Sequence, residues 1–223
     1  MRVALTVVCA VACLALVLAE YRHQRRLRVV AKLVASAAFV LLGAEAFRIG
    51  HDPAHVHFGQ AIALGLVLGA IGDAALLGAS SRAFLAGLVA FLLGHLAYVV
   101  AAGYLLPPSD WLAAAGPYAA LPAAVGIAVT VWLWPRLGSM RIPVIGYVIT
   151  IVAMVIAALA VARAGALPAP QHLRFAAGAA LFFVSDLAVA RDRFVGRAFA
   201  NKAWGLPTYY AGQLLIAWSL VGL

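Results

Sequence analysis

The sequence has few charged residues. Only 10% of its 223 residues are Asp, Glu, Lys or Arg, whereas 66% are hydrophobic, and the mean hydropathy is +1.06. A soluble domain normally carries about 25% charged residues, so this composition excludes a water-soluble globular domain. Cysteine is almost as scarce, with Cys9 and Cys13 lying four residues apart in an apolar run. Two such cysteines exclude zinc ribbons, disulfide scaffolds and thiol redox motifs, and their spacing is typical of one helix face.

Long apolar runs make up most of the chain. A transmembrane helix needs about 20 mostly apolar residues, and eight runs of about that length are separated by short connections. We therefore predict an all-α, polytopic membrane protein with eight transmembrane helices, folded as a single integral membrane domain over residues 1–223. Any activity is then expected within the bundle or at its surface. The predicted helices cover residues 2–19, 28–48, 57–78, 82–104, 111–134, 142–163, 172–190 and 204–223.

The basic residues lie mainly on one side of the predicted membrane. The chain has 16 Lys and Arg against 7 Asp and Glu, which gives a net charge of +9. Loops after the first, third, fifth and seventh predicted helices hold eleven bases: Arg22, Arg25, Arg26, Arg28, Arg82, Arg136, Arg141, Arg191, Arg193, Arg197 and Lys202. The opposite side holds four: Arg2, Arg48, Arg163 and Arg174. Because cytoplasmic loops are enriched in Lys and Arg, both termini are predicted to lie outside the cytoplasm.

This charge distribution also bears on location and partners. We expect a multi-pass protein of the cell (inner) membrane whose bases contact anionic lipid headgroups at the cytoplasmic face. The heavier positive cluster follows the first apolar run, so this run is expected to remain as a helix rather than be cleaved as a signal peptide. No pattern of bases interleaved with aromatic residues is present, which argues against nucleic acid as a partner.

Several polar side chains fall inside the predicted helices. A charge at mid-bilayer costs at least ~2.5–3.5 kcal/mol, so such residues tend to face a cavity and mark function. On the predicted topology, three charged residues lie about one turn from the cytoplasmic edge, and polar residues of the fourth and eighth helices lie at similar or greater depth. We predict that they form a polar pocket open toward the cytoplasmic leaflet. These residues are Lys32, Asp73, Asp186, His95, Tyr98, Tyr209, Tyr210 and Gln213.

Three of these residues also have simpler explanations. Lys32 could extend its ammonium to the lipid phosphates, His95 could be a satisfied packing residue, and Tyr209 could anchor the interface. Asp73 and Asp186 are harder to explain in this way, because a carboxylate in hydrocarbon needs a partner or must stay protonated.

A short repeated spacing relates the two aspartates. A glycine precedes each by eight residues, Gly65 before Asp73 and Gly178 before Asp186. Their helices are four apart in order and hence parallel, which is consistent with a 4+4 internal repeat.

Four segments resemble motifs of a known membrane family. Together with Lys32, which stands where that family has a lysine opening its second helix, their order and spacing are similar to the YhhN-like, or lysoplasmalogenase, family. The segments are 68–77 (LGAIGDAALL), 91–98 (FLLGHLAY), 178–186 (GAALFFVSD) and 209–216 (YYAGQLLI). The resemblance implies an eight-helix hydrolase that cleaves the vinyl-ether bond of lysoplasmalogens to a fatty aldehyde and glycerophosphocholine or glycerophosphoethanolamine.

That reaction suits two membrane carboxyl groups. Protonation of the alkenyl carbon distal to oxygen gives an oxocarbenium ion, which needs a positioned acid and a negative neighbour. We expect one of Asp73 and Asp186 to be the general acid and the other to stabilise the cation or orient water. No cofactor or metal is required. The substrate-binding candidates are His95, Tyr98, Tyr210 and Gln213 for water or the glycerol hydroxyl, Lys32 with Arg191 for the phosphate, and Tyr209 with Trp204 for a quaternary ammonium headgroup.

Other functions remain open at this stage. Intramembrane Asp, His and Lys would equally serve a proton-coupled small transporter, and a lipid-binding membrane protein is a related alternative. Gly72-Asp73 with a second membrane aspartate is also found in intramembrane aspartyl proteases, although position 70 is alanine here. A zinc-dependent lipid hydrolase is disfavoured, because four of the six histidines lie at outer loops or helix ends: His51, His55, His57 and His172.

Overall fold

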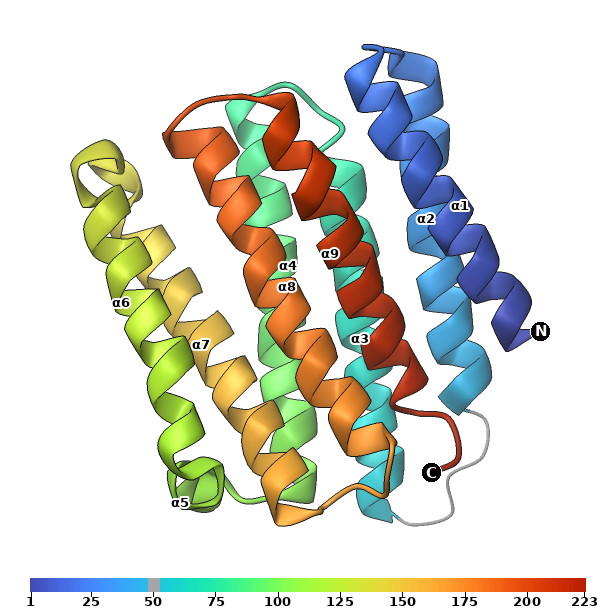
Figure 1. The fold of residues 1–223 in the computed structure, drawn as a ribbon, viewed down its shortest axis with the longest axis vertical. Helices are drawn as coiled ribbons and strands as arrows, with labels where there is room; N and C mark the ends of the chain where they lie inside the picture. The colour runs from blue at the N-terminus through green and yellow to red at the C-terminus, as the bar shows by residue number, and fades with distance from the viewer. Residues whose placement is uncertain (48–52) are drawn as a thin grey trace.

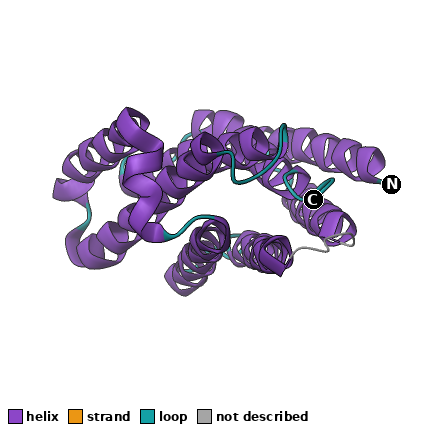
Figure 2. Cartoon of the chain, turned by 90° about the horizontal axis from the view of Figure 1, so that it is seen from below, coloured by secondary structure: helices purple, strands orange, loops and turns teal. Residues whose placement is uncertain are grey.

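The protein is a bundle of long helices. The computed structural model describes residues 1–47 and 53–223, and within these ranges it contains helices and no strand. The helices run up and down the bundle and are joined by short loops (Figures 1 and 2). They are α1 (Arg2–Tyr21), α2 (Arg25–Ala46), α3 (Pro53–Ala75), α4 (Ser81–Leu105), α5 (Trp111–Ala115), α6 (Ala120–Leu133), α7 (Arg141–Ala164), α8 (Gln171–Phe194) and α9 (Phe199–Trp218).

The predicted all-α membrane architecture is confirmed. Seven stretches of the described chain are long and apolar enough to cross a membrane. The eighth predicted run corresponds to α9, which has 20 residues and carries Asn201, Lys202 and Gln213. The end of the second predicted run, Arg48, lies outside the described residues. Which side of the membrane each terminus faces stays a prediction.

One predicted run is not a continuous helix. Residues 111–134 divide into α5, a 3-10 turn over Gly116–Ala119, and α6. Gly116 adopts a φ of +56°, which glycine reaches without steric cost, and Pro117 follows it directly. Proline lacks the N–H that would continue the helix. This pair therefore ends α5 and turns the chain into α6.

Close backbone contact holds neighbouring helices together. A Cβ on Gly178 of α8 would lie 2.8 Å from the backbone oxygen of Gly212 in α9, so the two backbones touch there. Gly65 of α3 faces the Tyr98 ring of α4, where a Cβ would have no room. Small residues at such crossings are typical of membrane helix pairs. Gly65 and Gly178, which precede the two aspartates by eight residues, thus each contact the helix that follows. The 4+4 repeat itself stays a prediction.

The two ends of the bundle differ in charge. We call one of them the basic end; it is formed by the loops 22–24, 76–80, 134–140 and 195–198. It lies at the top of Figure 1, and both termini lie in the lower half of that view. The helices α3 and α8 run toward the basic end, whereas α2 and α9 start there. Lys32, Asp73 and Asp186 therefore lie at similar heights in the bundle, as the sequence predicted.

Candidate functional site

Asp73 is the centre of a buried polar cluster. Its Oδ1 lies 2.7 Å from Lys32 Nζ, and the two side chains are only 2% and 10% exposed. Its Oδ2 accepts hydrogen bonds from Ser36 Oγ at 2.7 Å and from the Tyr210 hydroxyl at 3.3 Å. Ser36 follows Lys32 by one helical turn, so both side chains reach Asp73 from one face of α2. The carboxylate is thus held by three helices, α2, α3 and α9.

Asp186 has a different environment. The Tyr147 hydroxyl of α7 donates a hydrogen bond of 2.7 Å to its Oδ2, and His95 Nε2 of α4 lies 3.5 Å from the same oxygen. The His95 ring is fully buried and packs against Tyr147 and Phe182, with ring centroids 5.2 Å and 4.3 Å away. No lysine or arginine among the described residues pairs with this carboxyl group. The two aspartates therefore differ in the charge that faces them.

A hydrogen-bond chain connects α4 and α9 between these clusters. The Tyr98 hydroxyl donates to Gln213 Oε1 at 2.8 Å, and Gln213 Nε2 donates to the Tyr209 hydroxyl oxygen at 3.3 Å. Tyr98 and Gln213 are fully buried, and Tyr209 is 6% exposed. Because Tyr98 fixes the orientation of the amide, the oxygen of Tyr209 is an acceptor and its own O–H is left to donate elsewhere.

Both aspartates line one cavity, which we call the polar cavity. Its volume is about 120 Å³. It is lined by Glu20, Arg28, Lys32, Asp73, Leu76, Leu77, Phe91, Ser185, Asp186, Ala188, Val189, Asn201, Lys202, Gly205, Leu206 and Tyr209. Four predicted site residues thus reach its surface: both aspartates, Lys32 and Tyr209. The others, His95, Tyr98, Tyr210 and Gln213, stand behind the wall and contact these four or one another.

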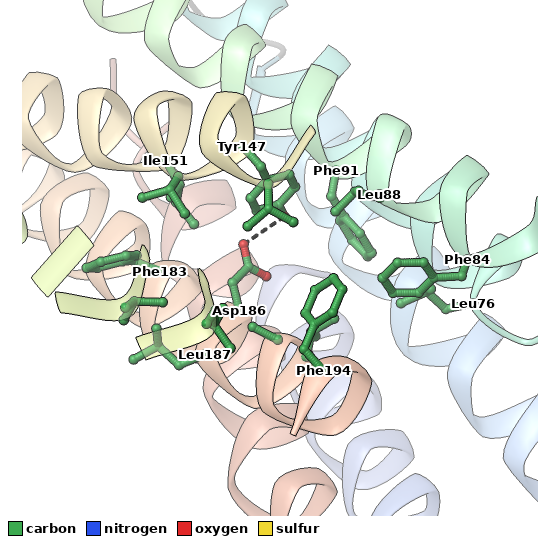
Figure 3. A pocket seen from close by; sticks show the side chains of 16 residues that line it. Leu76, Phe84, Leu88, Phe91, Tyr147, Ile151, Phe183, Asp186, Leu187 and Phe194 are labelled. Carbon is green, nitrogen blue, oxygen red and sulfur yellow. Dashed lines mark hydrogen bonds between the residues drawn. The ribbon is translucent and has the colours of Figure 1, made fainter. Parts of the chain in front are cut away.

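Asp186 also faces a second, apolar cavity. This cavity of about 60 Å³ lies between α4, α6, α7 and α8, and its walls are almost entirely aliphatic and aromatic (Figure 3). Figure 3 shows the Asp186 carboxyl group reaching Tyr147 among side chains such as Ile151 and Phe183. Asp186 and Phe91 line both cavities. The carboxyl group therefore stands at the boundary between a polar and an apolar space.

A third cavity opens at the basic end, and we call it the vestibule. Its volume is about 570 Å³. It shares Arg28, Leu76, Leu77, Val189, Glu20 and Lys202 with the polar cavity. The remaining lining residues are His23, Gly78, Ala79, Ser80, Phe84, Asp192, Arg193, Arg197, Ala198 and Phe199. The polar cavity is therefore continuous in its lining with a charged surface at one end of the bundle.

Sequence reasoning missed three residues that the geometry brings to the site. Ser36 lies one turn after Lys32, and Tyr147 lies near the start of α7, so their positions in the sequence could have indicated that they belong to the site. Arg28 was assigned only to the loops. Conversely, Arg191 and Trp204 line none of the three cavities, and the Lys32 ammonium bonds Asp73 instead of standing free for a phosphate. Within residues 1–47 and 53–223, no group of three or more His, Cys, Asp and Glu could hold a metal ion.

Comparison with known proteins identifies the family of the chain. The sequence model described as the YhhN family matches residues 27–220. The chain belongs to the YhhN family. Among relatives of this YhhN chain, a lysoplasmalogenase of Mycobacterium bovis is 37% identical over 142 residues, which cover 60% of this chain and 49% of the relative. A lysoplasmalogenase of Mycobacterium tuberculosis matches to the same extent.

A mammalian relative is also similar. Lysoplasmalogenase TMEM86A of Bos taurus is 31% identical over 169 residues, which cover 72% of this chain and 65% of the relative. The alignment spans about half the length of the mycobacterial relatives and about two thirds of the bovine one. No solved structure matches this YhhN chain.

Proposed function

We propose that this YhhN-family chain hydrolyses the vinyl-ether bond of lysoplasmalogens, releasing a fatty aldehyde and glycerophosphocholine or glycerophosphoethanolamine. One observation carries the proposal: Asp73 and Asp186 line the same polar cavity, and Asp186 also borders an apolar one. Such a boundary suits a lipid whose reactive bond joins a polar glycerol to a hydrocarbon chain. The names of the mycobacterial and bovine relatives support the same reaction.

The reaction needs an acid, a negative neighbour and water. A proton adds to the alkenyl carbon distal to the ether oxygen, and the positive charge spreads over the adjacent carbon and the oxygen. Water attacks that carbon and gives up a proton, and the hemiacetal collapses to the aldehyde and the free glycerol hydroxyl. The net change is the consumption of one water molecule. General acid catalysis of this kind contributes about 10²–10⁴-fold to the rate.

Asp186 is the better candidate for the proton donor. Asp73 is ion-paired with Lys32 at 2.7 Å and accepts two further hydrogen bonds, so both of its oxygens are already engaged as acceptors. Asp186 forms no ion pair with a described lysine or arginine, and Tyr147 bonds only its Oδ2, which leaves Oδ1 to carry a proton. A neutral carboxyl group is also cheaper than a charged one beside an apolar cavity. After the transfer, the Asp186 carboxylate can accept the proton that the attacking water releases.

Asp73 and Tyr209 fit the supporting roles. The Asp73 carboxylate supplies negative charge on the polar side of the cavity, where the oxocarbenium ion forms. Tyr209 lines the same cavity, and its oxygen already accepts from Gln213, so its O–H is directed to a further acceptor. The water or the ether oxygen of the substrate is such an acceptor. In this arrangement Tyr98, Gln213 and Tyr210 act by positioning.

We further infer that the basic end faces the cytoplasm of a cell (inner) membrane. Eleven of the bases belong to this side, and cytoplasmic loops are enriched in Lys and Arg. The substrate would then enter from the bilayer, with its alkenyl chain toward the apolar cavity and its headgroup toward the basic end.

Aldehyde release by the purified protein tests the proposal directly. Protein in lipid nanodiscs is supplied with a lysoplasmalogen, and the fatty aldehyde is trapped and quantified. Asp186→Asn is expected to lower turnover by about 10²–10⁴-fold, whereas Asp110→Asn, which changes an exposed aspartate in the turn before α5, is expected to match wild type. Wild-type turnover by Asp186→Asn would overturn the assignment of the acid.

The same assay separates the competing functions. Recovery of labelled substrate inside vesicles with its alkenyl chain intact would favour a transporter. An aspartyl protease needs two carboxyl groups that activate one water between them, and the ion pair of Asp73 with Lys32 disfavours that use. Loss of the alkenyl chain with release of aldehyde would favour hydrolysis.

A further inference from the structure

We propose that the vestibule is a binding site for the phosphodiester of a glycerophospholipid headgroup, held by Arg28, Arg193 and Arg197. This inference rests on the proposed function and names where the headgroup of its substrate binds. It also reassigns the phosphate from Lys32, whose ammonium is taken by Asp73.

The charge of the vestibule favours an anion. Its lining contains four Lys or Arg side chains against two carboxylates. Lys202 Nζ lies 3.1 Å from Asp192 Oδ2, so these two charges compensate each other. Three guanidinium groups then remain against Glu20 alone. A concave surface with this excess of one charge attracts the opposite charge more strongly than an open surface does.

The donors of these arginines are largely free. Arg28 has its Nη1 4.0 Å from Glu20 Oε1 and its Nη2 3.4 Å from the Leu77 oxygen, and both distances are long. Its Nε is buried and has no hydrogen-bond partner in the part of the chain that the structure describes. A buried donor without a partner costs free energy, so a ligand that supplies an acceptor is favoured there.

The other two guanidinium groups are similarly available. That of Arg193 lies over the Phe84 ring, 4.3 Å from its centroid, which holds the group without using its N–H donors. Arg197 forms no hydrogen bond or ion pair with any described residue, and it is exposed. A guanidinium fork matches two phosphate oxygens at once, so a phosphate would satisfy donors that the protein leaves open.

The separation of Arg28 and Lys32 along α2 matches the distance between the phosphate and the vinyl ether of the substrate. Arg28 lines both the vestibule and the polar cavity, and it precedes Lys32 by four helical residues, a rise of about 6 Å. In a lysoplasmalogen five bonds separate the phosphorus from the vinyl-ether oxygen, about 6 Å when extended. A phosphate bound at Arg28 therefore places the vinyl ether at the level of the Lys32–Asp73 ion pair.

Binding of an uncleavable ligand tests the site apart from catalysis. The probe is a lysophosphatidylethanolamine with a saturated alkyl ether in place of the vinyl ether, and its partner probe is the alkylglycerol of the same chain length. For Arg28→Gln and for the double variant Arg193→Gln/Arg197→Gln, we expect about tenfold or greater loss of affinity for the phosphate-bearing probe. Affinity for the alkylglycerol should not change. Arg191→Gln is the matched control. Arg191 lies on α8, as Arg193 does, and near the basic end, but it does not line the vestibule.

Two results of this experiment would contradict the inference. Unchanged affinity of the phosphate-bearing probe for both variants would overturn it, and so would an equal loss for both probes. Phosphatidylglycerol is then added to the nanodiscs: competition in wild type that is absent in Arg28→Gln assigns the site to bilayer phosphodiesters as well, and no competition assigns it to the substrate. Selective binding without aldehyde release from a lysoplasmalogen would refute the proposed reaction while leaving the phosphodiester site intact.

Discussion

Breaking the Lys32–Asp73 ion pair from its two sides should have unequal effects. Lys32→Met removes the cation and leaves the Asp73 carboxylate, whose side chain is 2% exposed, without a charged partner. Asp73→Asn leaves the ammonium instead, and Lys32 lies about two turns from the basic end. A lysine stem can extend toward the surface, whereas a short aspartate cannot move away from its site.

The magnitudes follow from this difference. An unpaired buried charge costs about 3–5 kcal/mol in soluble proteins and at least ~2.5–3.5 kcal/mol in membranes, so we expect Lys32→Met to lower the free energy of unfolding by about 3 kcal/mol. For Asp73→Asn we expect about 1 kcal/mol, because the amide keeps its hydrogen bonds to Ser36 and Tyr210. The double variant should lose about 1–2 kcal/mol, since no charge is left unpaired. The coupling energy is then about 2–3 kcal/mol.

Reversible unfolding in mixed micelles, followed by circular dichroism, measures these values. Lys202→Met is the control, because Lys202 pairs with Asp192 at 3.1 Å with a side chain that is 38% exposed, and such pairs contribute about 0–1 kcal/mol. The reasoning is wrong if the two single losses add in the double variant, or if Lys32→Met costs no more than Lys202→Met. Aldehyde release should stay low in the double variant despite its recovered stability.

Three further predictions concern the walls of the site. Tyr147→Phe removes the hydrogen bond to Asp186 and should lower kcat about tenfold with little change in KM, which steady-state aldehyde assays would show. Gly178→Ala should destabilise the protein by about 1–3 kcal/mol, because the new methyl group meets the α9 backbone, whereas Gly146→Ala, with nothing within 4 Å, should be neutral or stabilising in the same unfolding assay. Ile151→Phe fills part of the apolar cavity and should lower kcat/KM for long alkenyl chains more than for short ones; an equal effect on both would refute that use of the cavity.

Hydropathy predicted the helices well because the bilayer imposes the same requirement on each of them. The runs at 28–48 and 142–163 agree with α2 and α7 within a few residues. The exception is residues 111–134, where Gly116 and Pro117 interrupt an apolar run. Hydropathy cannot detect that break, because the interrupted segment stays as apolar as a continuous helix would be.

The depth of the site residues was predictable, but their partners were not. Counting turns from the basic end placed Lys32, Asp73 and Asp186 at one level, and all three line the polar cavity. Depth does not give the direction of a side chain around its helix. Whether Lys32 pairs with Asp73 or with a lipid phosphate depends on how the helices pack, which the sequence does not show. The same holds for Tyr147, whose contact with Asp186 depends on the neighbouring α7 and α8.

The ion pair of Lys32 and Asp73 has a chemical consequence for a site that releases an aldehyde. A fatty aldehyde condenses with a neutral amine to form a Schiff base and water, and this requires the lone pair of the nitrogen. In its ion pair with the carboxylate 2.7 Å away, the Lys32 nitrogen is an ammonium, which has no lone pair to offer. In the proposed reaction, Asp73 therefore protects Lys32, which lines the polar cavity, from covalent modification by the product made beside it.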